Sequence, residues 1–314
     1  GLTAKLTGNG VTGDAELEGN EEAINAYSES ILISQKRFAV RLTGKLDEQS
    51  NAYDMRSDAK DKLSMRLQEF IERQFFLKLG SVNNTTLTDI NGTVVGADCL
   101  WSNTPENIPD ATTTANGGGS RYICADVTGG ATSIASTDLI TPALISRCKA
   151  RAQLANPQIL PLKVDGRNSY VMFIHPYQAF DLKRNAEFQQ AMREAEVRGK
   201  TNPIFTGALG YWDNVLIFEH EYCPFLDISV ALHNFGAPAA GTDYAAVDAF
   251  RAILCGKQAG VFVKCKNPNG WVEKSFDYEN QMGFATGIIG GIQKIMFNSL
   301  EYGVITLDTA ATAL

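Results

Sequence analysis

The acidic residues near the start of the sequence have the types and spacing of a calcium loop. Asp14, Glu16 and Glu18 alternate and Gly19 follows them, which matches positions 1, 3, 5 and 6 of an EF-hand loop. Position 12 of such a loop is a Glu that binds Ca²⁺ through both oxygens, whereas this sequence has Asn25 there. A glycine-rich segment also stands where the entering helix belongs. The pattern argues against an EF-hand and leaves, as a minor alternative, a looser calcium site with the ligands Asp14, Glu16, Glu18, Glu21 and Glu22.

The same stretch favours a second interpretation, which is an electrostatic contact between subunits. Residues 14–29 contain six carboxylates and no cation, and basic residues follow on the next predicted strand. Charge complementarity of this kind sets docking register and association rate more than affinity. A solvated, charge-rich loop is the alternative that involves no binding. The interface hypothesis assigns the contact to Asp14, Glu16, Glu18, Glu21, Glu22, Lys36, Arg37 and Arg41.

Residues for catalysis do not form a recognisable constellation. The sequence has no HExxH zinc motif, no GxSxG nucleophile elbow and no Walker loop. His175 follows a predicted buried strand, which favours a structural role. His220 and His233 flank Cys223, so a soluble hydrolase that uses His220 and Cys223 is the enzymatic alternative. We predict no catalytic residue, no metal and no cofactor.

Composition narrows the class of protein further. The chain has 314 residues, 44% of them hydrophobic, and a formal net charge of −7, which disfavours a protein that reads nucleic-acid sequence. Its six cysteines form no CxxC pair, which argues against a zinc site and indicates reduced thiols in a cytosolic chain. No apolar run reaches the roughly 18 residues of a membrane span, and the first residues lack the apolar core of a signal peptide.

The acidic stretch must be positioned by the elements around it. Residues 31–42 are rich in apolar and β-branched side chains and predict a strand, with residues 2–6 as its antiparallel partner. Residues 9–30 would then be a long excursion at the end of a hairpin. Residues 50–79 change to a helical period, with Ser50 or Asn51 as cap and Gly80 as the stop. A helix of this length predicts a structural strut.

The rest of the chain predicts a mixed unit and further strands, and the fold class is α+β. Residues 81–137 are rich in Thr, Asn and Gly and predict irregular structure, with short strands near 93–100 and 121–127. Helices are expected at 141–154, after Pro176 and at 186–198. Strands are expected at 169–174, 214–221, 227–235, 260–265 and over the apolar positions of 276–297.

Five stretches of the sequence resemble one family over nearly the whole chain and in the family's order. They are "LTGNGVTGDAELEGNEEA" with "RLTGKLDEQSNAYDMRSDAKDKL", "YVMFIHPYQAFDLKRNAEFQQAMREAEVRGKTNPIFTGALGYWDNVLIFEHE", "RAILCGKQAGVFV", and "WVEKSFDYENQMGFATGIIGGIQKIMFNSLEYGVITLDTAA". These resemble major capsid proteins of tailed double-stranded-DNA phages. The resemblance implies the Hong Kong ninety-seven-like capsid fold.

The resemblance also implies how the chain is divided. Residues 1–47 would form the extended loop (E-loop) hairpin, and residues 48–137 the spine helix of the peripheral (P) domain with the Thr/Gly-rich region. Residues 138–260 would form the axial (A) domain. Residues 261–298 would return through the P-domain, and residues 299–314 would be a C-terminal segment of the A-domain.

Assembly is the function that the resemblance implies. Copies would form hexamers and pentamers of an icosahedral head that encloses double-stranded DNA without sequence specificity. Expected partners are other copies, a portal, and scaffold or decoration proteins, with no membrane contact. The expected location is the virion capsid, and the host cytoplasm during assembly. An encapsulin-type nanocompartment shell is the alternative with the same fold.

Overall fold

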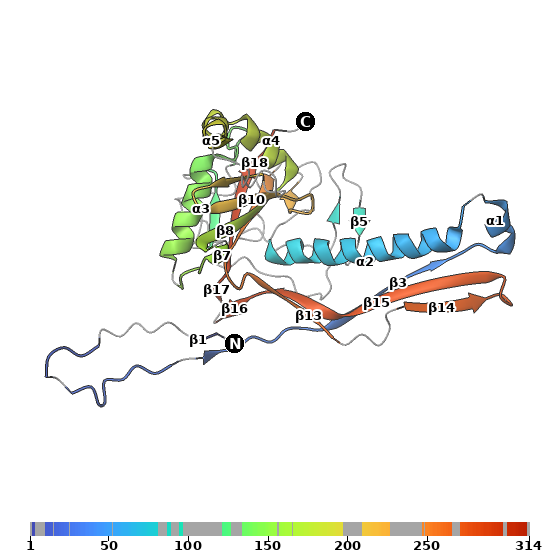
Figure 1. Ribbon diagram of the computed structural model, residues 1–314, viewed down its shortest axis with the longest axis horizontal. Helices are drawn as coiled ribbons and strands as arrows, with labels where there is room; N and C mark the ends of the chain where they lie inside the picture. Colours follow the sequence, from blue (N-terminus) through green and yellow to red (C-terminus); the bar gives the residue numbers. More distant parts are fainter. Residues whose placement is uncertain are drawn as a thin grey trace.

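The computed structural model divides the chain into an extended sheet with one long helix, a second sheet covered by shorter helices, and a projecting hairpin (Figure 1). It describes residues 2–3, 10–14, 16–24, 26–51, 53–80, 87–88, 94–96, 121–126, 134–155, 157–164, 166–196, 209–226, 247, 249–265, 271–297 and 300–312. The expectations for His233, for residues 227–235 and for most of 81–137 lie outside these ranges.

The first sheet is organised around one long strand, β15 (Gln281–Lys294). Strand β3 (Ser34–Arg41) pairs with it antiparallel along one edge, and β14 (Trp271–Phe276) and β13 (Gly260–Lys264) pair with its other edge. The structure thus corrects the predicted partner of the early strand. β1 (Leu2–Thr3) pairs with β2 (Ala26–Tyr27), whereas β3 joins a strand some 240 residues later.

The predicted strut is helix α2 (Met55–Leu79), which lies along one face of this sheet. Its 25 residues give a length of about 38 Å. Ala59, Leu63 and Phe70 on the predicted apolar stripe are buried against sheet residues that include Phe284 and Ile288. The stripe therefore predicted both the helix and the side that it buries.

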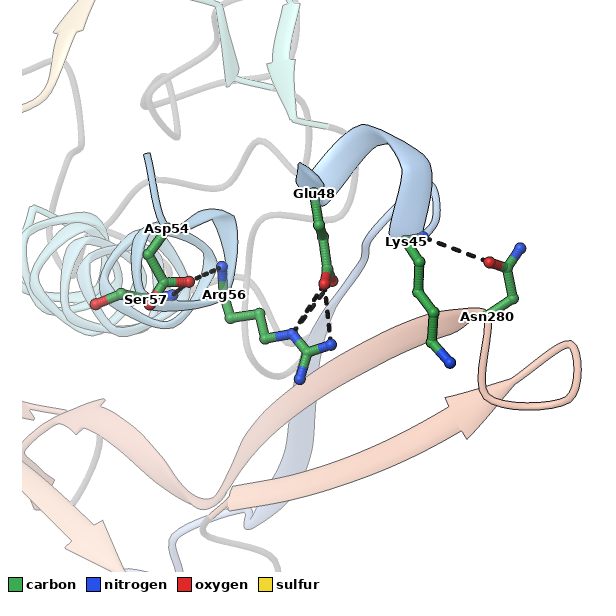
Figure 2. Close-up of polar contacts among 6 residues, drawn as sticks. All are labelled: Lys45, Glu48, Asp54, Arg56, Ser57 and Asn280. Atoms are coloured by element: carbon green, nitrogen blue, oxygen red, sulfur yellow. Dashed lines mark hydrogen bonds and ion pairs between the residues drawn. The ribbon is translucent and has the colours of Figure 1, made fainter. Parts of the chain in front are cut away.

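The start of α2 differs from the prediction. Residues 45–50 form a separate short helix, α1 (Lys45–Ser50), and the cap is Asp54 rather than Ser50 or Asn51. The Asp54 carboxylate accepts from the backbone N–H of Arg56 at 3.0 Å and of Ser57 at 3.4 Å (Figure 2). Glu48 on α1 accepts three hydrogen bonds from the Arg56 guanidinium, and this pair holds α1 beside α2. Gly80 ends α2 as predicted.

The second sheet combines strands from distant parts of the chain in the order β6-β18-β12-β8-β10-β9, with β11 and β7 on its sides. Every residue of β12 and β18 is buried, because both strands are central. Helices α3, α4 and α5 cover the sheet, with α3 capped by Thr141. The strands are β6 (Tyr122–Cys124), β7 (Leu162–Val164), β8 (Arg167–Ile174), β9 (Gly210–Trp212), β10 (Val215–Glu219), β11 (Phe225–Leu226), β12 (Ala249–Cys255) and β18 (Val304–Ala310), and the helices are α3 (Pro142–Leu154), α4 (Pro176–Arg184) and α5 (Ala186–Glu196).

A buried ion pair connects the long helix to this second sheet. Arg251 on β12 donates to both carboxylate oxygens of Asp308 on β18, each at 2.7 Å. The same guanidinium donates to the carbonyl oxygen of Gly80, at the end of α2, at 2.8 Å. Both charged side chains are almost fully buried. One residue therefore fixes the helix end to two strands.

Two further short strand pairs complete the described structure. Strands β16 (Met296–Phe297) and β17 (Leu300–Glu301) form a hairpin that follows β15 and lies beside the base of the N-terminal hairpin. Strands β4 (Leu87–Thr88) and β5 (Val94–Gly96) form another, near the predicted strand at 93–100. Within the described residues, no helix is both long and apolar enough to span a membrane.

Candidate assembly surfaces

The acidic residues lie on a hairpin loop that projects far from the rest of the molecule (Figure 1). We call residues 10–24 the acidic loop. Gly19 has a left-handed φ of 89°, which a glycine adopts without strain, and its N–H donates to the Glu21 carboxylate at 2.7 Å. Asn20 closes the same turn by donating to the Glu16 carbonyl oxygen at 2.9 Å. All five predicted acidic residues are exposed: Asp14, Glu16, Glu18, Glu21 and Glu22.

The calcium alternative finds no support in this geometry. Among the residues that the structure describes, which include these five carboxylates, no three acidic, His or Cys side chains gather closely enough to hold a metal ion. Within the turn, the Gly19 N–H donates to the Glu21 carboxylate, whereas the Asn20 amide donates to the backbone carbonyl oxygen of Glu16. The loop therefore presents separate carboxylates to the outside.

The three predicted basic residues occupy opposite sides of β3. Exposure alternates along this strand, so successive side chains point to opposite faces of the sheet. The ammonium group of Lys36 lies 5.7 Å from the ring centroid of Phe70, and Lys36 is therefore on the α2 side. Arg37 and Arg41 are on the other side and are exposed. The structure therefore places Arg37 and Arg41 on one side of the sheet and Lys36 on the other.

A further cation, Lys274 on β14, joins Arg37 and Arg41 on that side. The side chain of Phe276 links two of these cations, because the Arg41 guanidinium lies 4.6 Å and the Lys274 ammonium 5.0 Å from its ring centroid. Arg41 also donates to Gln281. Among the described residues of β3, β13, β14 and β15, none of those whose side chains point to this side is Asp or Glu. We call Arg37, Arg41 and Lys274 the cationic face.

Lys274 was missed because its position depends on the register between two strands. The segment "WVEKSF" alternates only weakly in hydrophobicity, and residues 271–275 are all exposed. The pairing of Lys274 with Gly283, which in turn pairs with Arg41, places it on the cationic face. Its neighbour Glu273 points the other way and forms an ion pair with Lys60 of α2 at 3.0 Å.

The acidic loop and the cationic face lie toward opposite ends of the molecule. Arg41 is the last residue of β3, beside α1, and β14 lies at the same end (Figure 1). The acidic loop extends in the other direction from the base of the N-terminal hairpin. A copy therefore cannot place its own loop on its own cationic face.

The residues of the enzymatic alternative are in a structural environment. Cys223 is buried, and its burial raises the pKa of the thiol, which disfavours the nucleophilic thiolate. The imidazole of His220 stacks on the ring of Phe76, with 4.1 Å between the ring centroids, and its Nδ1 atom accepts from the Tyr222 N–H. Burial lowers the pKa of His220. His175 caps α4 through its Nδ1 atom, and burial lowers its pKa to about 4. These contacts give His175 the predicted structural role.

The exposed charged surfaces are candidates for contacts with other molecules, and they leave the class of protein open. Comparison with known proteins gives the family. The model of a family described as phage capsid protein matches residues 1–313, and the chain belongs to this family. The major capsid protein of Pseudomonas phage KPP25 is 30% identical, over 99% of this chain and 82% of that protein.

Solved structures agree in fold. The capsid of Ralstonia phage GP4 is 28% identical with a TM-score of 0.78, over 99% of this chain and 82% of that one. The capsid asymmetric unit of cyanophage Pam1 is 24% identical with a TM-score of 0.72, over 99% of this chain and 83% of that one, and shows the fold alone. The protein has the predicted α+β, Hong Kong ninety-seven-like fold.

These comparisons decide between the functions considered. The protein is a major capsid protein of the icosahedral phage head, a structural protein rather than an enzyme. Its place is the virion capsid, and capsid proteins of this kind assemble into multimeric shells. The encapsulin alternative is not favoured, because both the family and the curated relative are phage capsid proteins.

Proposed function

We propose that copies of this chain form hexamers and pentamers by placing the acidic loop of one copy on the cationic face of the next. The observation that carries this proposal is that opposite charges lie toward opposite ends of one molecule. A contact between different surfaces of identical copies is head-to-tail, and such contacts generate closed rings when the rotation between copies closes. A loop and a receiving face on one chain therefore suffice to build a capsomer.

The proposed contact uses Asp14, Glu16, Glu18, Glu21 and Glu22 on the loop and Arg37, Arg41 and Lys274 on the face. Lys36 is left out, because its ammonium group lies over Phe70 on the α2 side. Exposed ion pairs contribute about 0.2–1 kcal/mol each, so these charges would govern register and association rate while apolar contacts supply affinity. Leu17 and Ile24, which are 60% and 70% exposed on the same loop, are the apolar candidates.

The predicted domain division stays part of the proposal, with one change. Residues 1–47 would be the E-loop region, residues 48–137 and 261–298 the P-domain, and residues 138–260 and 299–314 the A-domain. The parallel pairing of β6 with β18 supports moving Tyr122–Cys124 from the P-domain to the A-domain. The remaining partners are also proposals, namely a portal, scaffold or decoration proteins, and double-stranded DNA held without sequence specificity in a shell that assembles in the host cytoplasm.

A charge-reversal series tests the proposal. Glu16→Lys with Glu18→Lys reverses the loop, and Arg37→Glu with Arg41→Glu reverses the face, and each pair should reduce shell yield strongly. The chain that carries all four substitutions should assemble again, because attraction between loop and face is restored. Light scattering and electron microscopy measure yield, and circular dichroism checks that each variant folds. Failure of the fourfold variant to recover, with its fold intact, would contradict the proposed contact.

A further inference from the structure

The N-terminal hairpin crosses the first sheet at one close contact. Residues 28–33 lead from β2 to β3 and pass over β15 at Gly291. A Cβ atom at Gly291 would clash with the backbone carbonyl oxygen of Leu32. Glycine at this position therefore allows the segment to lie directly on the strand.

Glu29 binds this crossing segment to the sheet through both of its carboxylate oxygens. One oxygen accepts from the side-chain amide of Gln293 at 2.8 Å, and the other accepts from the backbone N–H of Met296 at 2.8 Å. Both bonds are partly buried, and hydrogen bonds to a charged acceptor are stronger than neutral ones. Both partners are donors, so the site requires a group that accepts twice.

Glu29 lies near the base of the hairpin, so its hydrogen bonds act on the direction in which the acidic loop projects. Glu29 lies two residues after β2, which closes the base of the hairpin. The turn of the loop is held by local hydrogen bonds, from Gly19 to Glu21 and from Asn20 to Glu16. The direction of a long projection is set where it meets a rigid support, and here that place is the end of β15.

We propose that Glu29 is a positioning residue that aims the acidic loop at the neighbouring copy. Its two hydrogen bonds and the Gly291 crossing fix the angle at which the hairpin leaves the sheet. A loop held in one direction meets the next copy in a single register, whereas a loop that swings samples many. This inference rests on the proposed docking of the loop, and it assigns to Glu29 a role in assembly rather than in the stability of the subunit.

An exchange of the two side chains tests the role of Glu29. In Glu29→Gln, the single amide oxygen at position 29 must accept from both the Gln293 side-chain amide and the Met296 N–H. In Gln293→Glu, a second carboxylate faces the carboxylate of Glu29. In the chain with both substitutions, the amide at position 29 donates to the carboxylate at 293 and its oxygen accepts from the Met296 N–H. Glu279→Gln, on the exposed turn after β14, is the matched control for loss of a surface charge.

Three readouts separate positioning from folding. In each single variant we expect hydrogen exchange of the Met296 amide to become at least about tenfold faster and shell assembly to slow about tenfold. Nitroxide amino acids incorporated at Thr12 and Ser64, both exposed, should give one narrow distance distribution in wild type and the exchanged chain, and a broad one in the single variants. The thermal midpoint should stay within about 2 °C of wild type throughout.

The outcomes distinguish this inference from the docking proposal on which it rests. Unchanged Met296 exchange and an unchanged distance distribution in Glu29→Gln overturn the positioning role. A broadened distribution with assembly at the wild-type rate overturns the docking proposal instead, because loop direction would then be irrelevant to assembly. Recovery of exchange, distance and assembly together in the exchanged chain supports the inference.

Discussion

Replacing Asp308 by Asn removes one charge from the buried pair that joins the long helix to the second sheet. The Arg251 and Asp308 side chains are 0% and 3% exposed, and the guanidinium has no access to water that could replace the lost carboxylate. Removing one partner of a buried, hydrogen-bonded pair costs about 3–5 kcal/mol, because the other charge stays buried without compensation. A domain is stable by only about 5–15 kcal/mol, so the loss would be severe.

Urea unfolding of dissociated subunits, followed by tryptophan fluorescence, measures this effect as a fall in the free energy of unfolding. The matched control is Glu48→Gln, which removes the carboxylate from the partly exposed pair with Arg56. An exposed pair contributes about 0–1 kcal/mol, so the control should change little. If Asp308→Asn lowers the free energy of unfolding by no more than Glu48→Gln does, the buried Arg251–Asp308 pair does not stabilise the junction between α2 and the second sheet. Replacing Arg251 by Met and Asp308 by Leu together should cost less than Asp308→Asn alone.

Four further predictions concern pH, thiols and assembly. Burial holds the pKa of His175 at about 4 in the folded state, below its ordinary value of 6.5, so the unfolded chain binds more protons between these values. Stability should therefore fall by about 3 kcal/mol as the pH drops from about 6.5 to 4, and His175→Asn, which keeps a capping oxygen, should flatten this profile in urea unfolding at each pH. Burial raises the pKa of the Cys124, Cys148 and Cys255 thiols to about 12, so these should label far more slowly than the partly exposed Cys265 when peptides are analysed after timed alkylation; fast labelling of Cys148 would contradict the buried core. High salt should slow wild-type assembly measured by light scattering, because it screens the exposed loop charges, and a salt-independent rate would count against electrostatic docking. Mixing the loop-reversed and face-reversed variants should restore rings with an even number of copies but not pentamers, since the two kinds of copy must alternate; closed shells from the mixture would argue against a strictly head-to-tail contact.

The sequence predicted elements whose pattern is local. The apolar stripe of α2 and the stop at Gly80 were predicted correctly, as were the helix at 141–154 with Pro142 in its first turn and the buried strand that ends at Ile174. In each case the information lies within one segment: a helical apolar stripe, a Pro or Gly at a helix end, or a short continuous apolar run. The cap of α2 was misplaced because α1 also has helical residues, and the break is made by the Asp54 bonds.

Features that depend on long-range pairing were not predicted. Strand β3 was paired with the nearest extended segment, although it pairs with β15, because hydrophobic patterning identifies strands without identifying their partners. No strand was assigned to Ala249–Cys255 or Val304–Ala310, whose central places in a sheet appear only in three dimensions. The face on which each cation lies is likewise set by register, which is why Lys36 was included and Lys274 was missed.

A cryo-electron microscopy reconstruction of shells assembled from the purified protein tests the central claim most directly. We predict that the acidic loop of each copy lies on the adjacent copy within a capsomer, with carboxylates of Glu16 or Glu18 within about 4 Å of Arg37, Arg41 or Lys274 of that copy. A map in which the acidic loops contact other surfaces, while the cationic face is covered by something else or by nothing, would contradict it.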